Sequence, residues 1–168
     1  MPKISEADFY IYKSGVFDLE LFYSTIRLWY SEHKFVPFER VYKDKAKDFG
    51  IELTNEWDAF RKINGYIRYW VNIQIKGWNV ADVEVVINGK KVKRTKARIR
   101  FRVFSELQTD WQERWTENQF MEKFRHFYEN YILKKKIKTV YEPEIWRMTS
   151  DLHAKIKQAL EMEAEKSG

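Results

Sequence analysis

An alternation of apolar and basic residues between Ala97 and Leu107 constrains the fold of this chain more than any other feature. The odd positions are small or apolar apart from Ser105, and the even positions from 98 to 102 are all arginine. Successive side chains on a strand point to opposite faces of its sheet. The stretch therefore predicts a strand with one buried face and one basic face.

The residues before this strand predict one helix and five strands. A short aromatic strand at positions 9–13 precedes a helix that starts after Asp18, the expected N-cap, and ends near position 31. Four more strands are expected, at positions 35–43, 51–59, 66–76 and 80–87. Pro37 cannot donate a hydrogen bond within a sheet, so the first of these four strands is expected at an edge.

Two helices are expected after the basic strand. Thr116 with Gln119 predicts a capping box at the start of the first helix. Large rings then recur at helical spacing, at Phe120, Phe124, Phe127 and Tyr131, and the three phenylalanines are expected to face the interior. Pro143 suits the first turn of the second helix.

Two Asn-Gly pairs predict the sharpest turns. Asn88-Gly89 fits a two-residue hairpin turn. Around Asn64-Gly65 the apolar faces of the two flanking strands agree best with a three-residue loop that pairs Trp57 with Val71. The glycine in this loop is expected to have a positive φ. A change in the parity of the apolar positions also predicts a bulge near positions 94–96.

Together these elements predict an α+β fold. We expect a curved antiparallel sheet of five to six strands, with one N-terminal helix and two C-terminal helices packed on one face. A chain of 168 residues is within the size that one core supports, about 250 residues. No repeat or linker interrupts it, so we expect a single domain over residues 1–168.

The order of the elements resembles that of the helix-grip superfamily, which includes START-like lipid carriers and Bet v 1-like proteins. The resemblance covers nearly the whole chain in layout, and no sequence motif accompanies it. One helix instead of two follows the first strand, and two helices instead of one close the chain. The resemblance implies a sheet that encloses an apolar ligand beneath the C-terminal helix, and no functional residue is carried over from the family.

Eight lysines and arginines between positions 90 and 102 give the strongest functional signal. The expected anion-binding residues are Lys90, Lys91, Lys93, Arg94, Lys96, Arg98, Arg100 and Arg102. Guanidinium groups bind phosphates in a bidentate way, and aromatic rings stack on bases. The rings expected to stack are Tyr66, Trp70 and Phe104.

This pattern predicts a non-enzymatic binding protein whose basic sheet face binds an anionic partner, with RNA or a ribonucleoprotein as the leading candidate. Another polyanion would fit the same residues. The alternative is a solvated sheet face whose cations balance the acidic residues Glu52, Glu56, Asp58 and Glu84. A protein–protein interaction scaffold is a third interpretation.

A second functional interpretation is an apolar cavity. Large apolar residues expected to face the interior could line a site for a small ligand between the sheet and the last helix, in a helix-grip carrier or enzyme. The candidates are Trp57, Tyr69, Phe101, Phe124 and Trp146. The alternative is a close-packed core formed by the same residues.

Other chemistry finds little support in the sequence. The chain has no cysteine, three dispersed histidines and no glycine-rich phosphate loop, so we expect no disulfide, metal site, cofactor or catalytic residue. The first residues lack the apolar core of a signal peptide, and no segment reaches the roughly 20 apolar residues that span a bilayer. These observations predict a cytoplasmic protein without a membrane partner, and they leave the oligomeric state open.

Overall fold

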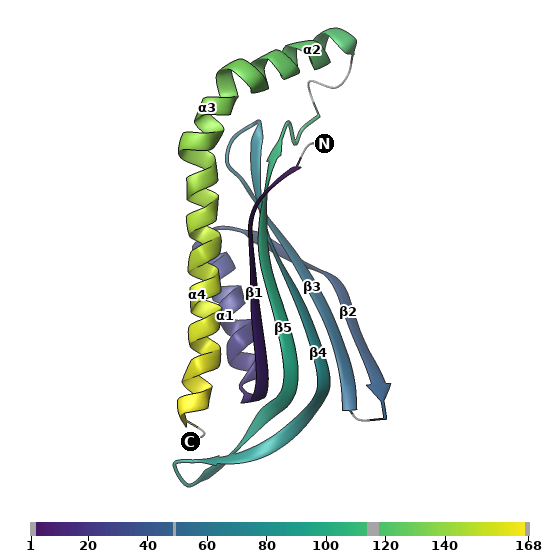
Figure 1. Ribbon diagram of the computed structural model, residues 1–168, viewed down its shortest axis with the longest axis vertical. Coiled ribbons are helices and arrows are strands. Elements are labelled where there is room, and N and C mark those ends of the chain that lie inside the picture. The colour runs from purple at the N-terminus through teal and green to yellow at the C-terminus, as the bar shows by residue number, and fades with distance from the viewer. Residues whose placement is uncertain (1–2, 49, 114–117, 167–168) are drawn as a thin grey trace.

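The computed structural model describes residues 3–48, 50–113 and 118–166 of the chain and shows an α+β fold (Figure 1). One antiparallel sheet contains all the strands in the order β1-β5-β4-β3-β2. The strands are β1 (Lys3–Phe17), β2 (Val36–Lys47), β3 (Gly50–Lys62), β4 (Ile67–Ile87) and β5 (Lys90–Thr109). The predicted fold class is confirmed, with five strands and with the Pro37 strand at an edge.

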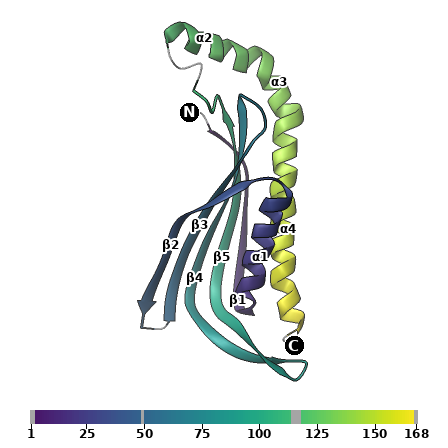
Figure 2. The same ribbon diagram turned by 180° about the vertical axis from the view of Figure 1, so that it is seen from behind.

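Two helices cover the same face of the sheet: α1 (Leu19–Glu32) and the long α4 (Glu142–Lys166) (Figures 1 and 2). Helix α1 begins at the predicted N-cap, since Asp18 Oδ1 accepts a hydrogen bond from the backbone N–H of Leu21 at 3.1 Å. Phe22 and Ile26 are one helical turn apart and are both buried. The ring of Phe22 lies 4.0 Å from that of Phe101 on β5, centroid to centroid, so α1 packs directly on the predicted apolar face.

The alternation along β5 is the reason for this packing. Ala97, Ile99, Phe101 and Val103 are each at most 4% exposed, whereas Arg98 between them is exposed. From α4, Ile145, Leu152 and Ile156 are fully buried against the same layer. Burial of apolar surface between sheet and helices therefore holds the two layers together.

The C-terminal region differs from the prediction of two separate helices. Helix α2 (Gln119–Tyr128), α3 (Lys134–Lys136) and α4 join through two π-helical turns, η1 (Glu129–Leu133) and η2 (Ile137–Tyr141), into one bent helix. Pro143 lies in the first turn of α4. A proline ring crowds the carbonyl four residues earlier, and a wider π-helical turn accommodates that crowding without ending the helix.

The first part of this helix does not pack on the sheet. Figure 1 shows α2 crossing the end of the molecule beyond the strands, and none of the residues of α2 is buried. The expectation that its rings face the interior is wrong, because Phe120, Phe124 and Phe127 are 75%, 49% and 52% exposed. The predicted capping residue Thr116 lies outside the described residues, and the N-cap is Asn118, whose Oδ1 accepts from the N–H of Met121 at 2.8 Å.

The turn at Asn64-Gly65 is longer than predicted. Trp57 lies opposite Ile73 instead of Val71, a shift of two residues that leaves every side chain on its predicted face. Gly65 does not have a positive φ. The side chain of Asn64 closes the turn instead, since its Oδ1 accepts hydrogen bonds from the N–H groups of Tyr66 and Ile67, both at 2.8 Å.

The second hairpin turn agrees with its prediction. Asn88 and Gly89 have φ angles of 51° and 77°, between the paired residues Ile87 and Lys90, as a mirror-image two-residue turn requires. The predicted bulge is present in this hairpin but lies on β4, between Trp78 and Ala81, instead of at positions 94–96 of β5. The extra residue therefore belongs to β4, while β5 keeps a continuous register with β1 at these positions.

Candidate functional site

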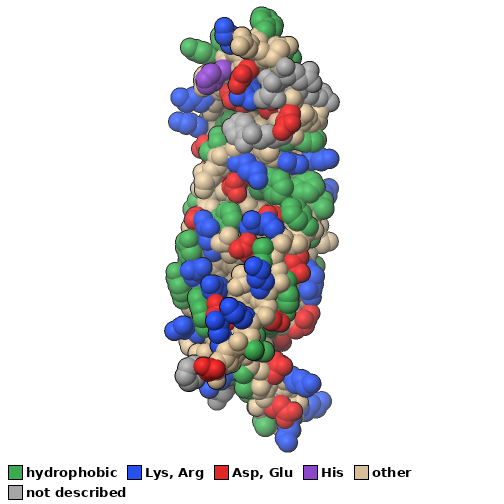
Figure 3. Space-filling view, turned by 90° about the vertical axis from the view of Figure 1, so that its right-hand side faces the viewer, with side chains coloured by type: hydrophobic (Ala, Val, Ile, Leu, Met, Phe, Trp, Pro, Cys, Tyr) green, Lys and Arg blue, Asp and Glu red, His purple; other side chains and the backbone are tan. Residues whose placement is uncertain are grey.

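The face of the sheet opposite α1 and α4, here named the open face, carries the row of arginines. Figure 3 shows this side, where cationic, acidic and hydrophobic side chains are mixed. Lys96, Arg98, Arg100 and Arg102 share the parity of β5 that points away from the buried positions. The basic face predicted from the sequence thus exists as a surface without a helix over it.

The remaining predicted anion-binding residues lie elsewhere on the β4–β5 hairpin. Lys90, Lys91 and Lys93 are exposed on an arm where β4 and β5 pair only with each other. Arg94 turns toward the start of α1, with Nη1 4.0 Å from Asp18 Oδ2 and 2.9 Å from the carbonyl oxygen of Lys93. The eight cations therefore form two groups, one on the sheet and one on the arm.

Arg102 forms hydrogen bonds with residues of the protein itself. Its Nε and Nη2 each donate to a different oxygen of Asp8 on β1, both at 2.9 Å, and Nη1 donates to Gln74 at 3.3 Å. The guanidinium also lies 4.2 Å from the ring centroid of Phe104. The hydrogen bonds that Arg102 donates to Asp8 raise the pKa of Arg102, so this arginine is less available to an external anion than its neighbours.

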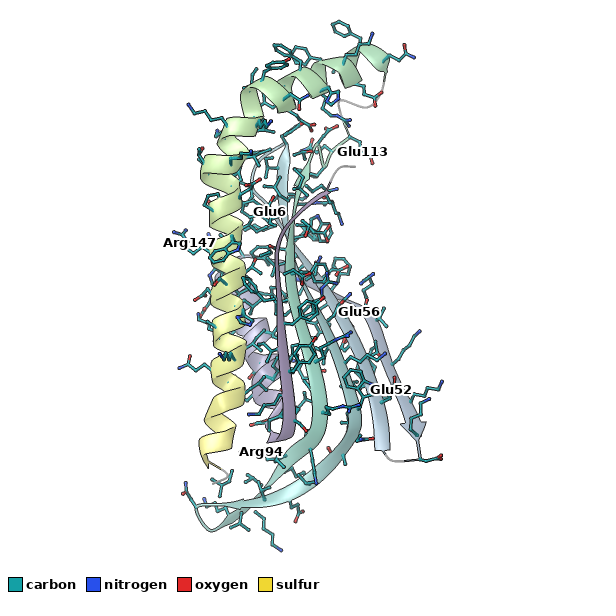
Figure 4. The ribbon with its side chains drawn as sticks, viewed as in Figure 1. Glu6, Glu52, Glu56, Arg94, Glu113 and Arg147 are labelled. Atoms are coloured by element: carbon teal, nitrogen blue, oxygen red, sulfur yellow. The ribbon has the colours of Figure 1, made fainter. Side chains whose placement is uncertain are left out.

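The acidic residues on β3 have cationic partners of their own. Lys76 Nζ lies 3.7 Å from Glu52, and Arg40 forms ion pairs with Glu56 and Asp58. Figure 4 shows Glu52 and Glu56 on the side of the sheet away from α4. The half of the open face formed by β2 and β3 is therefore largely charge-balanced, and the surplus of positive charge lies toward β1 and β5.

Arg98 and Arg100 remain available on the open face. In the register of the sheet, Arg98 lies between Ser14 of β1 and Trp78 of β4, and Arg100 lies between Tyr12 and Lys76. The guanidinium of Arg98 is 5.1 Å from the ring centroid of Trp78. Arg100 forms no ion pair within the described part of the chain.

A shallow groove of about 440 Å³ lies at this place. Its lining residues are Tyr12, Lys13, Ser14, Trp78, Arg98 and Ile99. Tyr12 is 72% exposed, so most of its ring is accessible on the β1 side of the groove. We name this feature the Tyr12–Trp78 groove.

The rings that the sequence suggested for stacking are not in this groove. Trp70 is 9% exposed and lies between Lys3 Nζ at 4.2 Å and the Arg68 guanidinium at 4.8 Å. Phe104 lies under Arg102. Tyr66 packs near the start of the C-terminal helix, where its hydroxyl donates to Glu129. Sequence reasoning missed Tyr12 and Trp78, because only the pairing of β1 and β4 with β5 brings them together.

The residues predicted to line an apolar cavity do not converge either. Tyr69 and Phe101 are fully buried within the core. Trp57 is half-buried and stacks on Tyr23, with ring centroids 5.8 Å apart. The other two predicted residues, Phe124 and Trp146, are 49% and 52% exposed. The packing of Phe22 on Phe101 fills the space between β5 and α1.

The chemistry available in the groove is that of a binding site. On the open face the groove provides two rings, the guanidinium of Arg98 and the hydroxyls of Tyr12 and Ser14, and its lining includes neither a carboxylate nor an imidazole. Two of the histidines stack on rings elsewhere, His33 on Trp29 and His153 on Phe9. Among the described residues, no group of three His, Asp or Glu side chains is placed to hold a metal ion.

Comparison with known proteins adds no assignment. The chain matches no protein-family model, no curated protein and no solved structure. No helix in the described part of the chain has both the length and the apolar character needed to cross a bilayer.

Proposed function

We propose that this protein is a non-enzymatic binding protein of the cytoplasm whose open face binds single-stranded RNA. The observation that carries the proposal is the Tyr12–Trp78 groove, in which two aromatic rings flank Arg98 on an uncovered sheet. RNA presents unstacked bases together with phosphates, and such a groove offers a partner to each.

The geometry of the sheet sets the spacing of these partners. Tyr12 and Trp78 lie on the strands on either side of β5 and are offset by two residues along it, so they are about 12 Å apart, since neighbouring strands are about 4.8 Å apart and each residue rises about 3.4 Å. Bases of an extended strand stack on the two rings, and the phosphate between them lies over Arg98. Arg100, which lies two residues further along β5 on the same face, binds the next phosphate.

The distribution of charge also favours RNA binding at this end of the sheet. Arg98, Arg100 and Lys96 lie on β5, and the exposed Lys90, Lys91 and Lys93 extend the positive charge along the hairpin arm. The acidic residues of β3 are held by Lys76 and Arg40. The polyanion is therefore expected to follow β5 toward the arm instead of crossing to β2.

The proposal is tested by fluorescence anisotropy with short labelled RNA at several salt concentrations. Trp78→Ala and Tyr12→Ala are each expected to weaken RNA binding by about 1 to 3 kcal/mol, the value of one base stacked on a ring. Their effect on heparin binding should be small, because heparin has no bases. Tyr42→Ala is the matched control, since Tyr42 is 55% exposed on β2, outside the groove.

Two results would contradict the proposal. One is wild-type affinity no tighter than the non-specific range of about 10⁻⁴ to 10⁻⁶ M at physiological salt. The other is an equal loss of RNA binding in the Tyr42 and Trp78 variants, which would show that the groove is not the place of binding.

A further inference from the structure

Helix α2 presents a row of rings to solvent at one end of the molecule. Phe120, Phe124, Phe127 and Tyr131 follow one another at intervals of four, three and four residues, so they lie along one side of the helix. Their exposed fractions are 75%, 49%, 52% and 77%. We name this row the aromatic ridge. Exposed apolar patches of this kind mark a surface that binds a partner.

A different side of the helix attaches it to the rest of the protein. Met121, Tyr128 and Glu129 are half-buried and Leu133 is buried. Glu129 accepts a hydrogen bond from the hydroxyl of Tyr66, whose ring contacts that of Tyr128. The inner side is thus fixed, and Figures 1 and 2 both show α2 lying across the end of the molecule with no other element beyond it.

Cations accompany the aromatic ridge. Positions 119–140 contain six lysines or arginines and two glutamates, and one of those glutamates is bound to Tyr66. The exposed cations are Lys123, Lys134, Lys135, Lys136 and Lys138. Four of them follow directly after the ridge, within one and a half turns of helix.

We propose that α2 and the turn after it bind the surface of a bilayer that contains anionic lipid. A helix with phenylalanines on one side and lysines beside them lies in the plane of the interface, with its rings among the acyl chains and its cations at the headgroups. Clusters of four to eight basic residues on such a helix favour anionic leaflets. The expectation of no membrane partner considered only apolar spans, and an in-plane helix does not require one.

The size and shape of the ridge favour a bilayer over a protein or a nucleic acid. Four rings of about 200 Å² each, exposed as stated, offer about 500 Å², whereas a stable dimer buries about 800 Å² on each partner. Single strands bind in a basic groove with rings set into it. The ridge is convex, and its cations lie beside and after the rings instead of between them.

Vesicle flotation tests this proposal, with phosphatidylcholine vesicles that contain or lack phosphatidylserine. The wild-type protein should float with the anionic vesicles and not with the neutral ones. Phe124→Ser and Phe127→Ser should each lower partitioning about tenfold, the value of burying half a ring. Lys134→Gln and Lys135→Gln should each lower it about fivefold.

Matched variants exclude general effects of the substitutions. Phe38→Ser removes a ring that is 44% exposed on β2, and Lys90→Gln with Lys91→Gln removes two exposed charges from the hairpin arm; both should float like the wild type. All of these positions are exposed, so the variants should fold, and circular dichroism checks that they do.

Three kinds of result would overturn the proposal. One is equal flotation with neutral and anionic vesicles, or flotation that is unchanged in Phe124→Ser. Another is a dimer in sedimentation analysis that Phe124→Ser dissociates, which would assign the ridge to a second copy of the chain. The third is a loss of RNA affinity in Phe124→Ser without any loss of flotation, which would assign the ridge to nucleic acid.

Discussion

Glu6 is expected to make the stability of this protein depend on pH near neutrality. Ser5 pairs with Glu106 and Ala7 with Ser105, so Glu6 is the extra residue of a bulge in β1. Figure 4 shows it on the α4 side of the strand. Its Oε1 is buried and accepts no hydrogen bond within the described part of the chain. Burial, and secondarily the charge of Glu142, raise the pKa of Glu6 to about 7.

The sign of the effect follows from the two protonation equilibria. Unfolding returns the pKa of Glu6 to its ordinary value of 4.5, so between these values the folded protein binds the proton more tightly than the unfolded chain. Stability therefore falls as the pH rises from about 4.5 to about 7, and the full penalty is present above that range. The pKa difference corresponds to at most about 3 kcal/mol. Glu6 is partly exposed, and solvent screening reduces the expected penalty to about 1 to 2 kcal/mol.

Glu6→Gln removes this charge without changing the shape of the side chain. Urea unfolding should show a gain of about 1 to 2 kcal/mol for the variant above pH 7 and little gain near pH 4.5, where the folded wild type carries the proton and the unfolded chain carries it about half of the time. Glu84→Gln, at an exposed position on the hairpin arm, is the control. Parallel pH profiles for wild type and Glu6→Gln would refute the reasoning.

Two further predictions concern β5. Phe101→Ala should lower the free energy of unfolding by about 3 to 5 kcal/mol, because a fully buried ring leaves a cavity. The control Leu28→Ala, at a position 60% exposed, should change that free energy by at most about 0.5 kcal/mol. Equal losses for the two variants in urea unfolding would contradict the face assignment. Arg100→Ala should lower the slope of log RNA affinity against log salt by about 0.7 at unchanged stability. Arg102→Ala should leave that slope unchanged and cost about 1 kcal/mol of stability through its lost bonds to Asp8; the reverse pattern would show that Arg102 is the arginine that meets the anion.

Much of the fold could be predicted because its patterns are local. The alternation around Phe101 identifies a strand and both of its faces, and Asp18 identifies the start of α1. Asn88-Gly89 identifies its turn because the backbone there requires two positive φ angles. At Asn64-Gly65 the same dipeptide misled the prediction, since the asparagine side chain closes a longer turn through hydrogen bonds that a dipeptide rule does not contain.

The candidate site was less predictable because it depends on long-range pairing. Arg98 and Arg100 were identified from the alternation of residues along their strand and from the density of charge around it. Tyr12 lies within the predicted aromatic strand at positions 9–13, but nothing in the sequence indicates that this strand lies beside β5. The exposure of Phe124 was not predicted for a different reason. Its helical spacing is that of a core helix, and periodicity does not reveal whether the sheet extends far enough to cover the ring.

The position of β1 in the sheet has a consequence for the order of folding. Strands β2 to β5 pair in sequence order, and the tightest pair, Ile87 with Lys90, closes a loop of two residues. The pairs between β1 and β5 join residues from 78 positions apart, Phe17 with Thr95, to 105 positions apart, Lys3 with Gln108. The entropy lost in closing such loops delays these contacts. During synthesis β1 is made before the other four strands, and the residues of β5 that pair with it follow at least 78 positions later. We therefore expect β1 to dock last, and the edge of β5 to stay unpaired until it does.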